Sequence, residues 1–382
     1  MPPPTTCAFV AGEASGDLIA ASVVAELRQR EPQLRCAGIG GDRMIDAGFE
    51  AWGHVRELSV RGYVEVLRHL PRLLRLRAGL LARLRAEPPA VFVGVDAPDF
   101  NLGLEEKLRA SGVRVVHLVS PSIWAWRSER LEQIRRAVDR MLLVFPFEQQ
   151  IYDDAGIPAT YVGHPLASMI PLLPDAAAAR ARLGIAHDGP LVAVLPGSRT
   201  DEVRHLGPPF FAAMSLLRAR EAALRFVLPA ADPDLKRTLG RMLASRTELS
   251  GCVTLTDGRS HDCLEAADVV LVASGTATLE AALYKRPMVI AYRMPALSAW
   301  IMRRKGTIPF VGLPNILAGE SLVPELLQEQ VTPAAIADTV HSLLRDDARR
   351  TALAERFAAM HRELRRDTAV LAADSILEVA HK

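Results

Sequence analysis

The stretch CAFVAGEASGDLIAASVVAELRQR, residues 7–30, decides the fold, because an apolar run leads through a glycine-rich turn into a run of helical period. We expect a strand at Cys7–Ala11 and a helix over Leu18–Arg30, joined by a short loop. Such a loop presents backbone N–H groups and the positive end of the helix dipole, which suit an anion. The G-x-G-x-x-G pattern is missing here, and the next strand runs into Gly38-Ile39-Gly40-Gly41 without an acid for a ribose, which argues against hydride transfer.

The same alternation of apolar strands and helical stretches continues through both halves of the chain. In the first half we predict further strands near Leu34–Ile39, Ala90–Val95, Val113–Val119, Met141–Phe145 and Thr160–Val162. In the second half we predict strands near Leu191–Leu195, Arg225–Leu228, Val253–Leu255, Val269–Ala273 and Met288–Ala291. This alternation is typical of parallel sheets, whose ligand sites lie at the carboxyl ends of the strands. The predicted fold class is α/β, with two sheets whose edges we expect to face one cleft.

The domain organisation follows from length and from one interruption of the pattern. A chain of 382 residues exceeds one ordinary domain and predicts two. A proline-rich segment of low charge, Gly163–Pro174, interrupts the alternation, and we interpret it as the linker. The predicted domains are residues 1–165 and 175–345, followed by C-terminal helices over residues 346–382.

Composition excludes several classes of protein. A chain that is 49% hydrophobic and 24% charged is not disordered, and it has no uncharged apolar run of the roughly 18 to 20 residues that span a bilayer. The N-terminus shows no secretory signal, so the cytosol is the expected compartment. The net charge of +2 neither requires nor excludes an anionic partner. The cysteines form no zinc-ligand pattern and are expected to be reduced and buried: Cys7, Cys36, Cys252 and Cys263.

Two junctions in the second half combine glycine with residues that bind phosphate. In Leu195-Pro196-Gly197-Ser198-Arg199 the glycine permits close backbone approach, the serine supplies a hydroxyl and the arginine offers a bidentate fork. In Ala273-Ser274-Gly275-Thr276-Ala277-Thr278-Leu279-Glu280 a helix begins with hydroxyl residues, and Glu280 lies about one turn inside, where its carboxylate suits a ribose diol. Either junction taken singly is equally well explained as a helix cap. Together on one sheet edge they favour a nucleoside diphosphate.

Asp96 is the candidate general base in the first half. It follows the strand Ala90–Val95 at its carboxyl end, where a carboxylate projects from the sheet edge. Its alternative role is to cap the next helix, but Asp99 or Asn101 fits that role better, since each lies nearer the helical run.

Three further motifs carry weaker signals. The string Asp232-Pro233-Asp234 has the D-x-D form of a metal site, but a turn and a helix N-cap explain it better, and we predict no metal. Ser120–Arg127 contains Trp124 and Trp126 at a strand exit, so we expect one to pack and the other to line a pocket. His117 lies within a predicted strand and is interpreted as a core residue.

The segment Arg61–Arg85 carries seven arginines and one acidic residue, interleaved with leucines at helical spacing, and Pro71 is expected to divide or start the helix. One interpretation is a crossover helix whose leucines face its own sheet. The alternative is an interfacial helix, with arginine on phospholipid head groups and leucine on acyl chains. Met294–Lys305 has the same character, and no nucleic-acid motif accompanies either stretch. The predicted membrane contacts are Arg68, Arg72, Leu73, Arg75, Leu76 and Arg77.

Five strings, taken together and in chain order, resemble the lipid-A-disaccharide synthase family. They are Gly12-Glu13-Ala14-Ser15-Gly16-Asp17, Asp96-Ala97-Pro98-Asp99-Phe100-Asn101, Ser120-Pro121-Ser122-Ile123-Trp124-Ala125-Trp126, Leu195-Pro196-Gly197-Ser198-Arg199 and Leu313-Pro314-Asn315. The likeness covers nearly the whole chain, and five motifs across both halves make it specific.

The resemblance implies an inverting glycosyltransferase of the GT-B type, with two Rossmann-like domains around a cleft, last helices that return to the first domain, and no metal or other cofactor. The implied donor is UDP-2,3-diacylglucosamine and the implied acceptor is 2,3-diacylglucosamine 1-phosphate. The implied products are the β-1,6-linked lipid A disaccharide 1-phosphate and UDP. The resemblance also implies peripheral attachment to the cytoplasmic face of the inner membrane of a Gram-negative bacterium. The oligomeric state, a homodimer included, stays open.

The resemblance also implies a role for each motif residue. Asp96 would take the proton from the acceptor 6-hydroxyl, and Glu280 would hold the ribose. Arg199 would stabilise the charge on the diphosphate together with the N–H groups around Gly197, Ser198, Ser274, Gly275 and Thr276. The remaining substrate contacts would be Ser15 and Asp17 with a sugar, Asn315 with the donor, and Trp124 in the pocket.

Three rival functions remain at this stage. Two are other GT-B proteins, namely a UDP-sugar epimerase and a peptidoglycan-type N-acetylglucosaminyl transferase. The third is a membrane-associated nucleotide- or lipid-binding protein without turnover.

Overall fold

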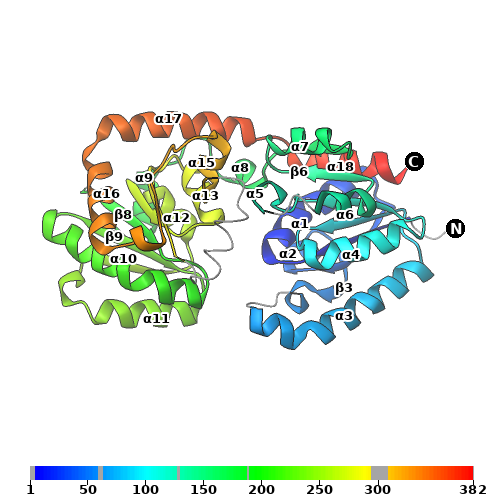
Figure 1. The fold of residues 1–382 in the computed structure, drawn as a ribbon, viewed down its shortest axis with the longest axis horizontal. Coiled ribbons are helices and arrows are strands. Elements are labelled where there is room, and N and C mark those ends of the chain that lie inside the picture. Colours follow the sequence, from blue (N-terminus) through cyan, green and yellow to red (C-terminus); the bar gives the residue numbers. More distant parts are fainter. Residues whose placement is uncertain (1–4, 59–62, 127–129, 187–188, 294–308, 382) are drawn as a thin grey trace. The chain divides into compact units, whose positions relative to one another are not determined.

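The computed structural model describes residues 5–58, 63–126, 130–186, 189–293 and 309–381. The chain divides into two compact units (Figure 1). The first unit comprises Met1–Ser168 and Leu364–Lys382, and the second comprises Met169–Glu363. The C-terminal residues therefore belong to the same unit as the N-terminal residues.

The first unit contains a seven-stranded sheet in the order β3-β2-β1-β4-β5-β6-β7. Its strands pair in parallel and are β1 (Thr6–Ala11), β2 (Arg35–Gly40), β3 (Glu50–His54), β4 (Val91–Val95), β5 (Arg114–Leu118), β6 (Arg140–Leu143) and β7 (Ala159–Tyr161). The helices of this part of the chain are α1 (Ala14–Arg30), α2 (Asp42–Asp46), α3 (Tyr63–Ala86), α4 (Pro98–Arg109), α5 (Ile123–Trp126), α6 (Arg130–Ala137), α7 (Glu148–Asp154), α8 (Pro165–Met169) and α18 (Thr368–Ala380).

The second unit contains a six-stranded sheet in the order β10-β9-β8-β11-β12-β13. Its strands also pair in parallel and are β8 (Leu191–Leu195), β9 (Arg225–Ala230), β10 (Val253–Asp257), β11 (Val269–Val272), β12 (Met288–Tyr292) and β13 (Glu325–Leu327). Its helices are α9 (Ala176–Arg182), α10 (Thr200–Arg220), α11 (Pro233–Ala244), α12 (Ser260–Ala266), α13 (Thr276–Leu283), α15 (Leu313–Ala318), α16 (Pro333–Arg345) and α17 (Asp347–Leu364).

All of the strands predicted from apolar runs are present, and two further strands were missed. The missed strands, β3 and β13, each form one of the two edges of their sheet and consist of half-buried or exposed residues. They were missed because an edge strand need not carry the continuous apolar run that marks a strand buried on both faces. The expectation that Pro71 divides or starts a helix was wrong, because α3 continues through it.

The order of strands reverses at one point in each sheet. In the first sheet β1 lies between β2 and β4, and in the second sheet β8 lies between β9 and β11. Chain connections on the two sides of such a point run to opposite faces, which leaves a crevice at the carboxyl ends of the central strands. The glycine-rich loops after β1 and β8, and the turns after β4 and β11, lie at these points.

Helices cover both faces of the first sheet. On one face β1 packs against α1 and α18, with Phe9, Leu27 and Ile376 fully buried in one cluster. On the other face the sheet packs against α3, α4, α6 and α7, where Phe92 and Tyr152 are fully buried. Helix α18 is thus part of the core of the first unit, although it is the last helix of the chain.

We expect Ile376→Ala to lower the free energy of unfolding of the first unit by about 2 to 5 kcal/mol, because it opens a cavity between α18 and the sheet. Leu173→Ala is the matched control, since Leu173 is 89% exposed, and we expect it to change stability by less than about 0.5 kcal/mol. Urea unfolding followed by circular dichroism and amide exchange measures both. Equal effects of the two substitutions would show that α18 is not packed in the core.

Candidate functional site

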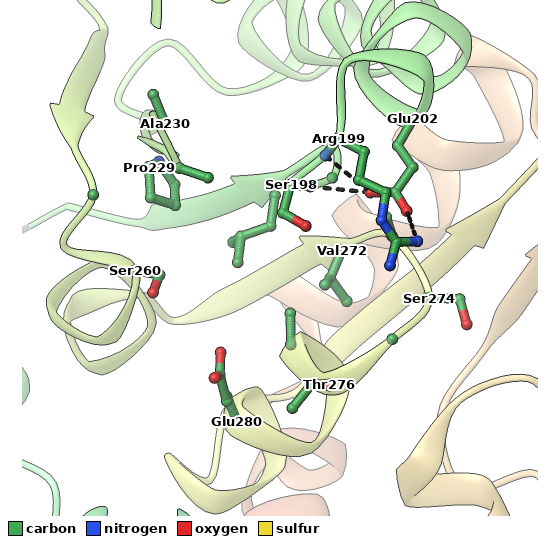
Figure 2. A pocket seen from close by; sticks show the side chains of 17 residues that line it. Ser198, Arg199, Glu202, Pro229, Ala230, Ser260, Val272, Ser274, Thr276 and Glu280 are labelled. Carbon is green, nitrogen blue, oxygen red and sulfur yellow. Dashed lines mark hydrogen bonds and ion pairs between the residues drawn. The ribbon is translucent and has the colours of Figure 1, made fainter. Parts of the chain in front are cut away.

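A cavity of about 520 Å³ lies at the carboxyl edge of the second sheet (Figure 2). Its walls come from the loops that follow β8, β9, β10 and β11 and from the first turns of α10, α12 and α13. Seven residues predicted to bind the donor line it, namely Gly197, Ser198, Arg199, Ser274, Gly275, Thr276 and Glu280. The second strand-order reversal therefore brings both predicted junctions to one cavity.

Glu202 organises the loop after β8. Its Oε2 accepts the backbone N–H groups of Ser198 (3.0 Å) and Arg199 (3.3 Å), and its Oε1 lies 3.3 Å from Nη1 of Arg199 (Figure 2). Gly197 has φ +128°, and a Cβ there would lie 2.5 Å from Cβ of Glu202, so only glycine allows this packing. In this structure the N–H group of Ser198 is bonded to Glu202, and a contact between Ser198 and a diphosphate stays a prediction.

The start of α13 offers backbone N–H groups instead. Gly275 (φ +132°) is its N-cap, and no side chain in the described part of the chain caps it. The nearby hydroxyls bind the backbone: Oγ of Ser274 donates to the carbonyl of Val311 (2.9 Å), and Oγ1 of Thr278 donates to the carbonyl of Gly275 (2.8 Å). The first turn of this eight-residue helix has no side-chain cap, so its backbone N–H groups have the chemistry that suits an anion.

Glu280 lines the cavity one turn further along α13, and its side chain is 18% exposed. Nε2 of His261 lies 3.5 Å from its Oε1, and the hydrogen bond with Glu280 raises the pKa of His261 above its usual value. Sequence reasoning missed His261 as the neighbour of Glu280. It also missed Glu202 and the lining residues after β9 and β10, which are Pro229, Ala230, Ala231, Gly258 and Ser260. The sequence does contain a signal for these lining residues, because they follow directly after the carboxyl ends of predicted strands.

Asn315 does not line this cavity. Its side chain is fully buried, Nδ2 donates to the carbonyl of Val323 (2.9 Å) and to Oε1 of Glu325 (2.8 Å), and Oδ1 accepts the N–H of Val323 (2.8 Å). Asn315 thus fixes the loop between α15 and β13, and its contact with the donor stays a prediction. The string Asp232-Pro233-Asp234 caps α11, since Oδ1 of Asp232 accepts the N–H of Leu235 (2.8 Å).

Asp96 lies in a left-handed turn at the first strand-order reversal. Asp96 and Ala97 have φ +54° and +46°, and the side chain of Asp96 is half-buried. A Cβ at Gly12 would lie 2.0 Å from Cβ of Ala97, so the loop after β1 packs directly on this turn. The expectation that Asp99 or Asn101 caps the next helix was wrong. Asp99 pairs with Arg130, and Nδ2 of Asn101 donates to the carbonyl of Asp96 (2.8 Å).

Ser15 and Asp17 lie in the first turns of α1 but differ in exposure. Ser15 is exposed, whereas Asp17 is 5% exposed. The carboxylate of Asp17 accepts the N–H groups of Gly41 (2.7 Å), Arg43 (3.2 Å) and Met44 (3.2 Å). Both of its oxygens therefore bind the N-terminus of α2, and a contact between Asp17 and a sugar stays a prediction. Contact by Ser15 stays a prediction.

Trp124 belongs to a buried polar cluster at the ends of β5 and β6. Its Nε1 donates to Oε1 of Glu148 (3.2 Å), and its ring meets Phe147 edge-on at 5.4 Å. Glu148 is almost completely buried, which raises its pKa to about 8. The hydroxyls of Ser120 and Tyr152 lie 2.7 Å apart in the same cluster. A pocket contact by Trp124 stays a prediction.

The basic helix α3 places its leucines in two environments. Leu80 and Leu84 are buried in the core of the first unit, whereas Leu70 and Leu74 are 42% and 45% exposed. Of the predicted membrane contacts, Arg72 and Arg75 are exposed, and Leu73, Leu76 and Arg77 are half-buried. The side chain of Arg68 and the segment Met294–Lys305 lie outside the described residues. Within the described ranges, no helix combines the length and apolar character required to cross a membrane.

Glu148 makes a pH-dependent contribution to stability. Because burial raises its pKa from 4.5 to about 8, its contribution is fully present below pH 4.5 and is lost as the pH rises through about 8. We expect Glu148→Gln to lessen the fall in the free energy of unfolding between pH 5 and pH 9, measured by urea unfolding. Glu87→Gln, at an exposed position, is the control. Parallel curves for the wild type and Glu148→Gln would show that Glu148 is ionised in the folded protein.

Comparison with known proteins places the chain in a family. The family model for lipid-A-disaccharide synthetase matches residues 7–376. The lipid-A-disaccharide synthase of Paraburkholderia phytofirmans is 53% identical over 382 residues, covering 100% of this chain and 98% of that protein. The lipid-A-disaccharide synthase of Burkholderia mallei is 53% identical over 377 residues, covering 98% of this chain and 97% of that protein.

Solved structures match the fold at low identity. The glycotransferase of kitacinnamycin superposes with a TM-score of 0.63 at 18% identity, covering 99% of this chain and 100% of that one. MurG of Acinetobacter baumannii superposes with a TM-score of 0.58 at 13% identity, covering 98% of this chain and 100% of that one. These structures show the fold alone, which is the GT-B arrangement of two Rossmann-like domains with parallel sheets. Because a family model spans residues 7–376 and full-length relatives are 53% identical, the chain belongs to the lipid-A-disaccharide synthetase family.

Proposed function

We propose that this protein condenses UDP-2,3-diacylglucosamine with 2,3-diacylglucosamine 1-phosphate to give the β-1,6-linked lipid A disaccharide 1-phosphate and UDP. The observation that carries the proposal is the cavity at the carboxyl edge of the second sheet, in a chain of this family. It combines a guanidinium, an uncapped helix start and a carboxylate, which suit a diphosphate and a ribose.

The donor would be held by charge and by hydrogen bonds from one unit. Arg199 and the N–H groups at the start of α13 face the diphosphate, whose negative charge grows as UDP departs. Glu280 accepts hydrogen bonds from the ribose hydroxyls. Because positive charge comes from a side chain and a helix dipole, the proposed step uses no metal ion.

The acceptor would be activated by the first unit. The carboxylate of Asp96 takes the proton of the acceptor 6-hydroxyl as its oxygen bonds to the anomeric carbon of the donor. The bond from that carbon to the diphosphate oxygen breaks with its electron pair, so UDP leaves and the configuration inverts. The proton ends on Asp96 and the negative charge on UDP.

We expect Arg199→Ala to weaken UDP binding about 10- to 100-fold, because one charge-assisted hydrogen bond contributes about 1.5 to 3 kcal/mol. Arg204→Ala is the matched control, since Arg204 is an exposed arginine on the same helix that pairs with Asp201 and does not line the cavity. Isothermal titration with UDP measures both. Equal affinities of Arg199→Ala and wild type would exclude Arg199 from the donor site.

Activity distinguishes the proposal from its rivals. We expect mixing of both lipids to release UDP, and Asp96→Asn to lower kcat about 100- to 10,000-fold, the usual contribution of a general base. Mass analysis of the lipid product separates this transfer from an epimerase and from an N-acetylglucosaminyl transferase, because only this transfer joins two acylated glucosamines. Binding of both lipids without release of UDP would favour a binding protein.

We also propose that the start of α3 attaches the protein to the cytoplasmic surface of the inner membrane. Exposed Leu70 and Leu74, one helical turn apart, lie beside exposed Arg72 and Arg75. Leucine with flanking arginine suits the boundary between acyl chains and anionic head groups. Both substrates of the proposed reaction carry acyl chains, so they reside at such a surface.

Replacing Arg72, Arg75 and Arg77 together with Glu should weaken binding to vesicles that contain anionic lipid, and added salt should weaken binding of the wild type. The control replaces Arg237, Arg241 and Arg345 with Glu, which changes the net charge equally at exposed positions of the second unit. Vesicle sedimentation measures both. Equal losses from the two triple variants would show that net charge, and not α3, determines attachment.

A further inference from the structure

A buried polar pair lies beneath the strand ends that carry Asp96. Glu105 on α4 and His117 on β5 are both fully buried, and Oε1 of Glu105 lies 2.6 Å from Nδ1 of His117. Gly94 on β4 is the register partner of His117, and a Cβ at Gly94 would lie 1.8 Å from Oε1 of Glu105. The pair therefore occupies the space that a side chain on β4 would otherwise fill.

The same helix holds the turn above. Asn101 is fully buried on α4, one helical turn before Glu105, and its Nδ2 donates to the carbonyls of Asp96 (2.8 Å) and Val10 (3.2 Å). One face of α4 thus contacts both the backbone of Asp96 and the side chain of His117.

The backbone above this cluster is strained. Asp96 and Ala97 have positive φ at the end of β4, and Val119 has φ +76° at the end of β5. Left-handed conformations are unfavourable for side chains, most of all for a β-branched valine. Such strain persists only where the surrounding contacts hold the backbone in place.

The cluster is not arranged for stability alone. Oε2 of Glu105 and Oδ1 of Asn101 are buried and have no hydrogen-bond partner among the described residues. Nε2 of His117 has no well-aligned partner there either, although the carbonyl of Val119 favours its charged form. Buried polar atoms without partners lower stability, so an apolar core would be more stable at this place.

Charge links the pair to Asp96. Burial opposes protonation of His117, but the negative charge and hydrogen bond of Glu105, with a further contribution from Asp96, raise the pKa of His117 above its usual value. Its register partners on the neighbouring strands, Gly94 and Met141, carry no charge. The charged groups that act on His117 are therefore Glu105 and Asp96.

We propose that Glu105 and His117 are positioning residues for Asp96: the pair, with Asn101, holds the strained turn that carries the Asp96 carboxylate. The pair touches no reacting atom and acts through Asp96. This inference rests on the proposed role of Asp96 as the general base.

The test compares His117→Asn and Glu105→Gln with the wild type in steady-state kinetics. Glu105→Gln is nearly isosteric and keeps an acceptor for His117, so it folds even if His117→Asn does not. We expect kcat to fall at least about tenfold in each, because a small displacement of a reacting group has a large effect on rate. KM for the donor should change less than twofold, since the donor site lies in the other unit.

Leu27→Ala is the control for lost stability, because Leu27 is fully buried on the opposite face of the same sheet. It should lower the midpoint of thermal unfolding without lowering kcat. If both pair variants behave like Leu27→Ala, with kcat unchanged, the inference is overturned.

Asp96→Asn separates this inference from the proposed function. If Asp96→Asn keeps its activity, Asp96 is not the base, and the proposed mechanism fails together with this inference. If Asp96→Asn is inactive, combining it with His117→Asn should lower kcat no further than Asp96→Asn alone. A full additional tenfold loss would show that His117 acts independently of Asp96 and would overturn the inference while leaving the base in place.

Discussion

The reversal of strand order at one point in each sheet is the constraint on which the rest of the structure depends. All crossovers between parallel strands are right-handed, so the helices that connect strands on the two sides of the reversal cover opposite faces of the sheet. The loops that follow the two central strands therefore diverge at the carboxyl edge. The candidate base Asp96 and Arg199, which is predicted to bind the donor, both lie beside such a point. Accessible backbone N–H groups and projecting side chains occur together at the carboxyl edges of the two sheets. The topology therefore restricts binding and catalysis to these edges.

The loops at both strand-order reversals need residues with positive φ, but the two sheets use different residues there. The loops after β8 and β11 turn through Gly197 and Gly275, which adopt positive φ at little cost. The turn after β4 uses Asp96 and Ala97 in left-handed conformations, held by Gly12 above and by Asn101 below. Glycine would adopt this turn without strain, but it has no carboxylate. A carboxylate at position 96 therefore comes with backbone strain, which the neighbouring contacts must offset.

Charge in the donor cavity is balanced internally before a ligand binds. Glu202 bonds the loop amides and pairs with the Arg199 guanidinium. A diphosphate would compete with this carboxylate for Arg199, whereas the start of α13 has no such internal acid among the described residues. In the proposed complex, the N–H groups of the helix start would bind the diphosphate without losing another partner, whereas Arg199 would exchange Glu202 for the diphosphate.

Local patterns in the sequence were sufficient to predict the buried strands, the glycine-rich loops after β1 and β8, and the strand-end position of Asp96. They were sufficient because a strand buried on both faces must be continuously apolar and a left-handed turn favours glycine. They failed for the edge strands β3 and β13, and they did not predict that the polar groups of Asp17 and Asn315 bind Gly41 and Val323 of the protein itself. The sequence did not predict the pairing of Glu105 with His117, because this pairing requires α4 to pack against β5. The partner of a buried polar group is determined by contacts in space and not by distance along the chain.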